Sequence, residues 1–171
     1  MGSTEIRQAI EAATEFLTNN PEQARYTDSP AVATVVDGLL VKVTGPRGET
    51  ITTDMVAAVG GKGSAPSPGW LFRAADASCV ATVIAMRAAM LGITLDSLAV
   101  TVDSESDDRG LLGMDPTIPA GPLRGRVAVT IAAAGVDPST LEEVALWGVK
   151  HCPVCDAVER AVPVSIEVTV G

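Results

Sequence analysis

Residues 67–92, which read SPGWLFRAADASCVATVIAMRAAMLG, decide the fold of this chain. Ser67 can cap a helix, Pro68 suits the first helical turn because its missing N–H is no loss there, and Gly92 is a natural C-terminal stop. The pattern predicts one helix of roughly 24 residues, about 36 Å long. Beyond Cys79 this helix is apolar on nearly every side, so it must be enclosed all round. A chain of 171 residues would struggle to enclose it alone, which favours a homodimer.

A membrane span is the alternative explanation for the apolar residues 79–95. Arg87 interrupts this segment at its middle, and the uninterrupted apolar run is shorter than the roughly 20 residues that a span needs. Near the N-terminus, Glu5, Glu11 and Glu15 lie on an amphipathic pattern, unlike a signal peptide. We therefore expect a buried helix and no membrane association.

The segments on either side predict an α+β fold. An amphipathic helix is expected at residues 3–18, and a further helix opens at Asp137-Pro138. The element order lacks the alternating βαβ units of a parallel sheet. We assign residues 1–20 to an N-terminal helical extension and residues 28–171 to a single domain. Strand-like segments lie at residues 31–38, 39–45, 50–58, 97–106, 123–135 and 161–170, the last being the most regular.

Composition limits the function classes. The net charge is −9, and an acidic surface repels phosphate backbones, so nucleic-acid binding is not expected. The hydrophobic share of 47% argues against disorder, but only 3% of residues are aromatic. A core of small side chains gains little area per residue, which again favours a subunit interface. Three cysteines do not make a disulfide framework, so a reducing cytoplasm is the expected compartment.

The segment KHCPVCDAV, residues 150–158, holds the single histidine and two of the three cysteines. It could be a redox pair, half of a metal site or a sulfur-rich helical turn. Pro153 favours a helix that starts at Cys152, where backbone N–H groups lower the pKa of the first thiol. The redox interpretation is the strongest of the three. Cys79 is equally consistent with a buried small hydrophobe and with a reactive thiol.

A zinc site would gather Cys79, His151, Cys152 and Cys155. Adjacent His and Cys residues rarely both point at one ion, and the second C-x-x-C pair of structural zinc sites is missing. We therefore expect no metal and no other cofactor. A catalytic Ser/His/Asp triad is not evident, and the glycine-rich residues 60–69 match a phosphate-binding loop only loosely.

Two segments together resemble the osmotically inducible protein C (OsmC) family, which includes the organic hydroperoxide resistance proteins. Residues 64–105 look like the family's central helix and following strand, with Ser-Pro, then apolar residues, then a small residue and Cys79. Residues 151–168, HCPVCDAVERAVPVSIEV, are similar to its second signature, a Cys-Pro that leads into the last strand. The resemblance spans roughly residues 30–170.

The resemblance implies an intertwined homodimer in which antiparallel β-sheets enclose the long central helices, with active sites at the dimer interface. It further implies a thiol-dependent peroxidase that reduces organic hydroperoxides in oxidative or osmotic stress defence. By resemblance Cys79 is the peroxidatic thiol and Cys152 the resolving thiol. Cys79 would be oxidised to a sulfenic acid, which Cys152 would trap as a disulfide before an external dithiol reduces it.

Several positions depart from the family pattern. Gly69 stands where family peroxidases place a Glu. The thiolate-stabilising Arg of an early strand has no counterpart, although Arg25 or Lys42 is a possible substitute. Asp76, three residues before Cys79, would oppose thiolate formation if it is ionised nearby. Cys155 stands where the family commonly has Ser.

Cys155 could therefore compete with Cys152 as resolving thiol, and His151 is another accessory candidate. A second hypothesis is non-catalytic: binding of a small apolar ligand or electrophile in a pocket at the dimer interface. Gly69, Trp70 and Phe72 would line that pocket, which the glycine enlarges while removing an acid.

Overall fold

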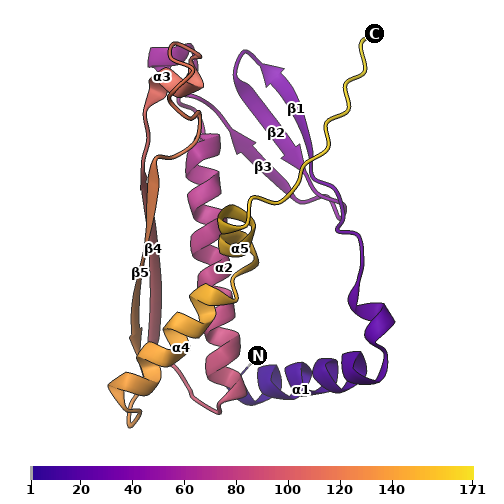
Figure 1. Ribbon diagram of the computed structural model, residues 1–171, viewed down its shortest axis with the longest axis vertical. Helices are drawn as coiled ribbons and strands as arrows, with labels where there is room; N and C mark the ends of the chain where they lie inside the picture. The colour runs from indigo at the N-terminus through magenta and orange to yellow at the C-terminus, as the bar shows by residue number, and fades with distance from the viewer. Residues whose placement is uncertain (1) are drawn as a thin grey trace. The chain divides into compact units, whose positions relative to one another are not determined.

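The computed structural model describes residues 2–171, which divide into two units (Figure 1). The first unit contains the residues up to Arg7 together with Asp76–Thr101 and Val127–Gly171. The second contains Gln8–Ala75 and Val102–Arg126. The elements are α1 (Ser3–Asn19), η1 (Pro21–Ala24), β1 (Val32–Asp37), β2 (Leu40–Thr44), β3 (Thr50–Thr53), η2 (Ala57–Val59), α2 (Pro68–Met90), β4 (Ser97–Glu105), α3 (Asp108–Leu111), β5 (Arg124–Ala132), α4 (Pro138–Lys150) and α5 (Pro153–Glu159). The predicted α+β fold is confirmed.

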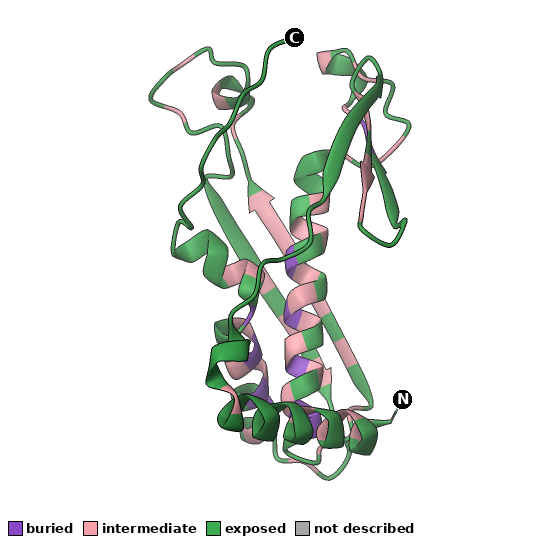
Figure 2. Cartoon of the chain, turned by 90° about the vertical axis from the view of Figure 1, so that its right-hand side faces the viewer, coloured by how far each residue is buried: buried purple, intermediate pink, exposed green. Residues whose placement is uncertain are grey.

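The core of the first unit forms around one stripe of α2. Val80, Ile84 and Ala88 recur every four residues, so they share one face of the helix, and all three are buried. Val144 of α4 and Cys152 complete this buried cluster. Figure 2 shows the buried residues on α2, on α4 and just before α5.

Close packing of α4 on α2 depends on a glycine. A Cβ atom added at Gly148 would lie 2.3 Å from Cγ1 of Ile84, which real Cβ atoms do not approach. At the edge of this contact the guanidinium carbon of Arg87 lies 4.8 Å from the centre of the Trp147 ring, a cation–π geometry. The helix predicted at Asp137-Pro138 is therefore present and docks through its small and aromatic residues.

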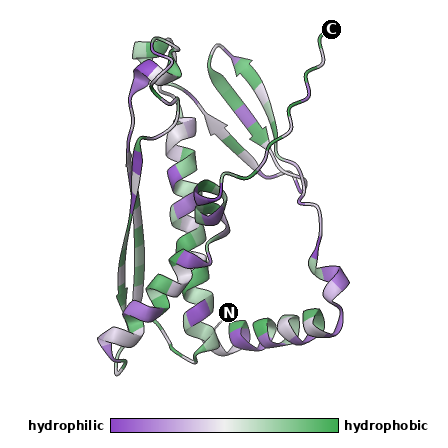
Figure 3. Ribbon diagram, viewed as in Figure 1, coloured by the Kyte–Doolittle hydropathy of each residue, from purple (hydrophilic) through white to green (hydrophobic). Residues whose placement is uncertain are grey.

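The prediction of one long helix is confirmed, with bounds Pro68–Met90 and with Gly92 in the left-handed conformation (φ 72°) just after it. Within the single chain, however, α2 buries mainly the one stripe, and Met86 and Met90 are exposed. Figure 3 shows the hydrophobic residues along α2. Among the described residues it is also the one helix long and apolar enough to cross a membrane, a test that core helices of soluble proteins pass as well.

β4 and β5 form a two-stranded antiparallel ribbon. The amide of Asp96, before β4, donates to Ala132 at the end of β5 (2.8 Å), and the amide of Leu123, before β5, donates to Glu105 at the end of β4 (2.7 Å). Alternate residues of β4 and β5 are half-buried, and Leu98, Val100, Val127, Val129 and Ile131 pack against the α2 cluster.

The second unit contains the three-stranded antiparallel sheet β1-β2-β3. Gly38 (φ 57°) turns the chain between β1 and β2, and Gly48 (φ 87°) turns it between β2 and β3. Val32, Val35 and Val36 of β1 are all more than half exposed. This sheet therefore presents an apolar edge strand that the single chain leaves uncovered.

A buried carboxylate orders the loop that leads from β3 to α2. Asp54 accepts hydrogen bonds from the backbone amides of Met55, Lys62 and Ser64 and from the Ser64 hydroxyl. Those bonds, chiefly the two from Ser64, hold the pKa of Asp54 below its ordinary value. The glycine-rich segment 60–69 is thus a structural loop closed around Asp54.

The predicted N-terminal helix is confirmed as α1 (Ser3–Asn19), and none of its residues is buried. The Ser3 hydroxyl donates to the carbonyl of Ile93, just after α2, at 3.3 Å. This bond ties the start of α1 to the first unit.

The strand predicted at residues 161–170 is wrong for the single chain, because the segment has no regular secondary structure. Its apolar side chains Val164, Ile166, Val168 and Val170 are at least 80% exposed. A strand needs a neighbouring edge to bond its backbone groups, and within this chain the segment pairs with none.

The close approach of α4 to α2 predicts the effect of two glycine substitutions. Gly148→Ala should destabilise the fold by about 1–3 kcal/mol, because the new methyl group overlaps Ile84. Gly69→Ala, in the first turn of α2 with no heavy atom nearer than 3.9 Å, should instead stabilise it by about 0.5–1 kcal/mol. Urea unfolding followed by circular dichroism measures both, and equal effects of the two variants would contradict the proposed helix packing.

Candidate functional site

Four polar or sulfur side chains of the first unit meet where α5 begins beside α2. Asp76 and Cys79 are three residues apart on α2 and so project from one face. Cys152 is the N-cap of α5, with Pro153 at the first helical position as the sequence predicts. Cys155 follows one turn later, so each helix contributes two residues spaced i, i+3.

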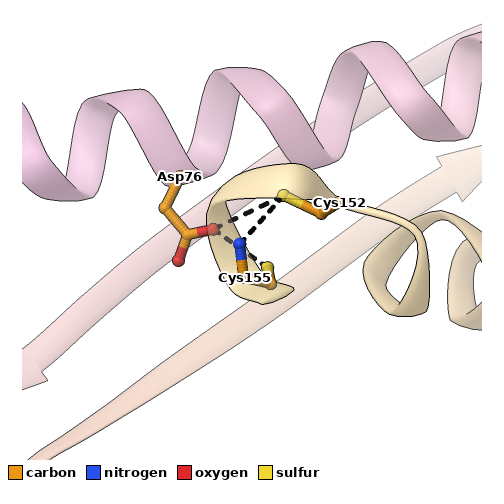
Figure 4. A group of neighbouring side chains, drawn as sticks. All are labelled: Asp76, Cys152 and Cys155. Atoms are coloured by element: carbon orange, nitrogen blue, oxygen red, sulfur yellow. Dashed lines mark hydrogen bonds between the residues drawn. The ribbon is translucent and has the colours of Figure 1, made fainter. Parts of the chain in front are cut away.

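The Asp76 carboxylate lies at the centre of this cluster (Figure 4). The Cys155 thiol donates a hydrogen bond to its Oδ1 at 3.0 Å, and the Cys152 thiol lies 3.9 Å from the same oxygen. The backbone amide of Cys155 in turn donates to Cys152 Sγ at 3.4 Å. Cys152 is fully buried, and Asp76 is only 9% exposed. Both sulfur atoms are therefore held against one carboxylate, with Cys152 buried and Cys155 half-buried.

Cys79 is the half-buried neighbour of this group. Burial raises the pKa of its thiol, and so do a hydrogen bond with the Cys152 thiol and the negative charge of Asp76; the backbone amide of Val154 acts in the opposite direction. The structure therefore brings Cys79 and Cys152 into contact, although they are far apart in sequence. The expected opposition of Asp76 to a Cys79 thiolate agrees with this pKa direction.

Cys155 is the second thiol whose pKa is raised, and its shift is the larger of the two. Burial raises its pKa, and the hydrogen bond to Asp76 raises it further because that bond stabilises the protonated thiol beside a carboxylate. Cys155 is consequently held as the neutral S–H form at ordinary pH.

The pKa shifts of Cys79 and Cys155 have no positively charged group among their causes. Arg25, one of the two possible substitutes for the family arginine, caps η1 in an exposed segment of the second unit. Among the residues that the structure describes, an acid but no cation thus contributes to the pKa shifts of Cys79 and Cys155.

His151 points toward its own helix. It is the C-cap of α4, its ring stacks on the Trp147 ring with centroids 3.8 Å apart, and its Nδ1 lies 2.7 Å from the Trp147 carbonyl oxygen. The side chain is also exposed. The structure thus engages His151 with Trp147 and gives it no hydrogen bond to the cysteines.

The second unit holds a separate cavity of about 390 Å³. Gly69 and Phe72, two of the three residues predicted for a pocket at the dimer interface, line this cavity of the single chain, together with Arg73 and residues of the loops around α3. Trp70 is half exposed and is not among the lining residues. The cavity wall is mostly apolar, and its charged members are Arg73, Asp107 and Asp108.

Sequence reasoning identified Cys79, Cys152 and Cys155 but missed the central place of Asp76. Asp76 was expected to act only on Cys79, whereas its hydrogen bonds come from Cys152 and Cys155. The signal that could have found it is the D-x-x-C spacing of α2, which matches the C-x-x-C spacing of residues 152–155.

The raised thiol pKa values predict a loss of stability in alkali. Unfolded cysteine ionises near its ordinary pKa of 9.0, whereas Cys155 and Cys79 keep their protons to higher pH when folded. The folded state then binds more protons than the unfolded state, so the free energy of unfolding should fall as pH rises above about 9. Urea titrations of reduced, chelator-treated protein at pH 8 and pH 10.5 measure this fall, which Cys155→Ser should reduce. If the free energy of unfolding fell as much in Cys155→Ser as in the wild type, the raised pKa of Cys155 would be contradicted.

The sequence matches the OsmC-like protein family over residues 61–167, more than half of the chain. No curated protein matches it. The fold is similar to that of an OsmC-like protein from Mycoplasma pneumoniae, with a TM-score of 0.66 and 13% identity over 79% of this chain and 89% of the other.

Two further structures share the fold. An organic hydroperoxide resistance protein from Elizabethkingia anophelis gives a TM-score of 0.58 at 18% identity, covering 78% of this chain and 89% of that one. The organic hydroperoxide resistance protein OsmC of Legionella pneumophila gives 0.54 at 21% identity, covering 78% and 90%. At these identities the likeness establishes the fold, and the match over residues 61–167 establishes the family. The chain is a member of the OsmC-like protein family.

Proposed function

We propose that this protein is a thiol peroxidase that reduces organic hydroperoxides, with Cys79 as peroxidatic and Cys152 as resolving thiol. The observation that carries the proposal is the packing of Cys79 against the buried cluster that contains Cys152, which α2 and the N-cap of α5 bring together. Membership of a family that includes organic hydroperoxide resistance proteins supports the substrate class.

The proposed reaction balances with one hydroperoxide and one dithiol. The Cys79 thiolate attacks the O–O bond of the hydroperoxide and becomes a sulfenic acid, while the alkoxide that leaves takes a proton from solvent to give the alcohol. The Cys152 thiol then attacks that sulfur, its proton joins the leaving hydroxide, and a Cys79–Cys152 disulfide and water are formed. An external dithiol reduces the disulfide by two exchange steps and is itself oxidised to a disulfide. Because its pKa is raised, Cys79 holds little thiolate at neutral pH, and we expect turnover to be slow.

We also propose that the working form is an intertwined homodimer. Three apolar surfaces of the single chain support it: the outer side of α2, the valines of β1, and the C-terminal residues 161–170, here called the tail. In the tail the alternate apolar residues from Val164 to Val170 are exposed. Together they leave more apolar surface uncovered than isolated surface residues account for. In a dimer the tail could extend a sheet of the partner subunit as an added strand.

A reducing cytoplasm is the compartment that suits this proposal. The three cysteines are free thiols, which a reducing environment maintains. The same environment supplies the external dithiol that the last step requires.

The cavity of the second unit favours a second candidate function, binding of a small apolar ligand. Its volume of about 390 Å³ is in the range of small-molecule sites, and Gly69 leaves open space where a longer side chain would stand. Native mass spectrometry of freshly purified protein tests this candidate. A retained small molecule that Phe72→Ala releases would support it, and protein of bare-chain mass would contradict it.

Activity measurements on cysteine variants test the peroxidase. Wild-type protein should consume cumene hydroperoxide when a dithiol is present, and Cys79→Ser should abolish consumption. Cys152→Ser should still form one sulfenic acid, detected with a dimedone probe, but should not close the disulfide. Cys155→Ser is the matched control and should retain turnover, because Cys155 is not a partner in the proposed disulfide. Absence of turnover by the wild-type protein would end the proposal.

Substitutions in the tail test the dimer. Ile166→Asp together with Val168→Asp should convert the dimer to monomer, because charges cannot be buried against a sheet without a partner. Ser165→Asp together with Thr169→Asp, on the other side of an extended chain, should have a much smaller effect. Sedimentation equilibrium measures the mass, and a wild-type protein of 17.5 kDa in solution would refute the dimer.

A further inference from the structure

We propose that Asp76, Cys152 and Cys155 form a binding site for a thiophilic divalent cation, with Zn²⁺ as the expected ion. This goes beyond the proposed peroxidase, which uses no metal. It also differs from the zinc site considered from sequence, which combined His151 with the three cysteines. In the structure His151 engages Trp147, and Asp76 supplies an oxygen ligand instead.

The spacing of the donor atoms fits a tetrahedral ion. The carboxylate oxygen and the two sulfur atoms all lie within 4.8 Å of one another. Zinc–sulfur bonds of about 2.3 Å and zinc–oxygen bonds of about 2.1 Å place tetrahedral ligands roughly 3.6–3.8 Å apart. The observed sulfur–oxygen separations of 3.0 and 3.9 Å bracket that value. Small side-chain rotations would therefore suffice to bring the three atoms around one ion.

The charge of the site calls for a cation. Asp76 is buried on the core stripe of α2, and its hydrogen bonds come from sulfur. The ion pairs recorded for residues 2–171 join other carboxylates, and none involves Asp76. A carboxylate removed from water without a cationic partner is costly. A divalent ion bound there would neutralise the carboxylate and replace the two thiol protons that now face it.

The donor set selects the kind of ion. Two thiolates with one carboxylate favour zinc over magnesium or calcium, which prefer oxygen ligands alone. The ligands come from two elements packed in one core, α2 and the start of α5, so the site is held by tertiary structure. Three protein ligands leave one position of the tetrahedron open, as in catalytic zinc sites.

Metal binding and the proposed disulfide exclude each other. Cys152 would be a ligand in one state and a partner of Cys79 in the other. Closing the disulfide would remove one ligand and release the ion.

Metal titration of the reduced full-length protein tests the site. After removal of metal with a chelator, the protein should bind one equivalent of Co²⁺ per chain, with the near-ultraviolet absorption of thiolate ligation and visible bands of tetrahedral geometry. Zn²⁺ should displace the Co²⁺. Binding below about a tenth of an equivalent, or a spectrum without thiolate absorption, would overturn the proposal.

Three variants make the test specific. Asp76→Asn, nearly equal in size, should weaken Zn²⁺ binding by about 10-fold or more, and Cys155→Ser should weaken it and reduce the thiolate absorption by about half. His151→Ala, beside Cys152 but turned to Trp147, should bind as the wild type does. Wild-type affinity in both ligand variants, or loss of binding in His151→Ala, would refute the ligand set. Circular dichroism of each metal-free variant checks that it is folded, and a misfolded Asp76→Asn leaves the decision to Cys155→Ser.

The metal site and the peroxidase can be refuted independently of each other. Cys79→Ser removes the proposed peroxidatic thiol but leaves the three ligands, so it should lose hydroperoxide turnover and keep one equivalent of metal. Turnover by metal-free wild-type protein that binds no Co²⁺ would end the metal site alone. Stoichiometric Co²⁺ binding by a wild-type protein without turnover would end the peroxidase alone.

Discussion

The packing of Cys152 against the buried stripe of α2 is the contact on which the structure of the first unit depends. Cys152 ends the connection from α4 and caps α5, and its side chain belongs to the same buried cluster as Val80, Ile84 and Val144. Because that stripe continues to Asp76, one turn before Val80, packing of the core also sets the thiols against a carboxylate. The packing that forms the core therefore also positions the side chains of the candidate site.

The electrostatics of the site follow from that packing. Burial first, and then the Asp76 carboxylate, favour the protonated thiols, and so the pKa of Cys79 and of Cys155 is raised. For a peroxidase such an environment lowers the thiolate fraction, whereas for a metal site it supplies an additional hard ligand. Cys152 is the residue that the two proposed uses share, as the partner of Cys79 in the disulfide and as a ligand in the metal site.

Uncovered apolar surface is the other prominent property of the single chain. α2 buries one stripe, β1 exposes its valines, and the tail has alternate apolar residues but no neighbouring strand. A core built from Ala and Val gains little area per residue, so such surfaces are a large part of the apolar total. A second copy of the chain is the simplest partner for all three surfaces.

The sequence by itself determined the local elements, because capping residues, glycine turns and apolar periodicity act over a few residues. It placed α1, α2, the hairpins of β1 to β3, and the helix start at Pro153, and the resemblance on its Cys-containing segments identified the family. It failed for residues 161–170, where strand periodicity is clear but a strand requires an edge to bond with. Only the tertiary structure decided that Asp76 receives the hydrogen bonds of Cys152 and Cys155, and that His151 turns to Trp147. Such contacts depend on how α2, α4 and α5 pack, and no local pattern encodes that geometry.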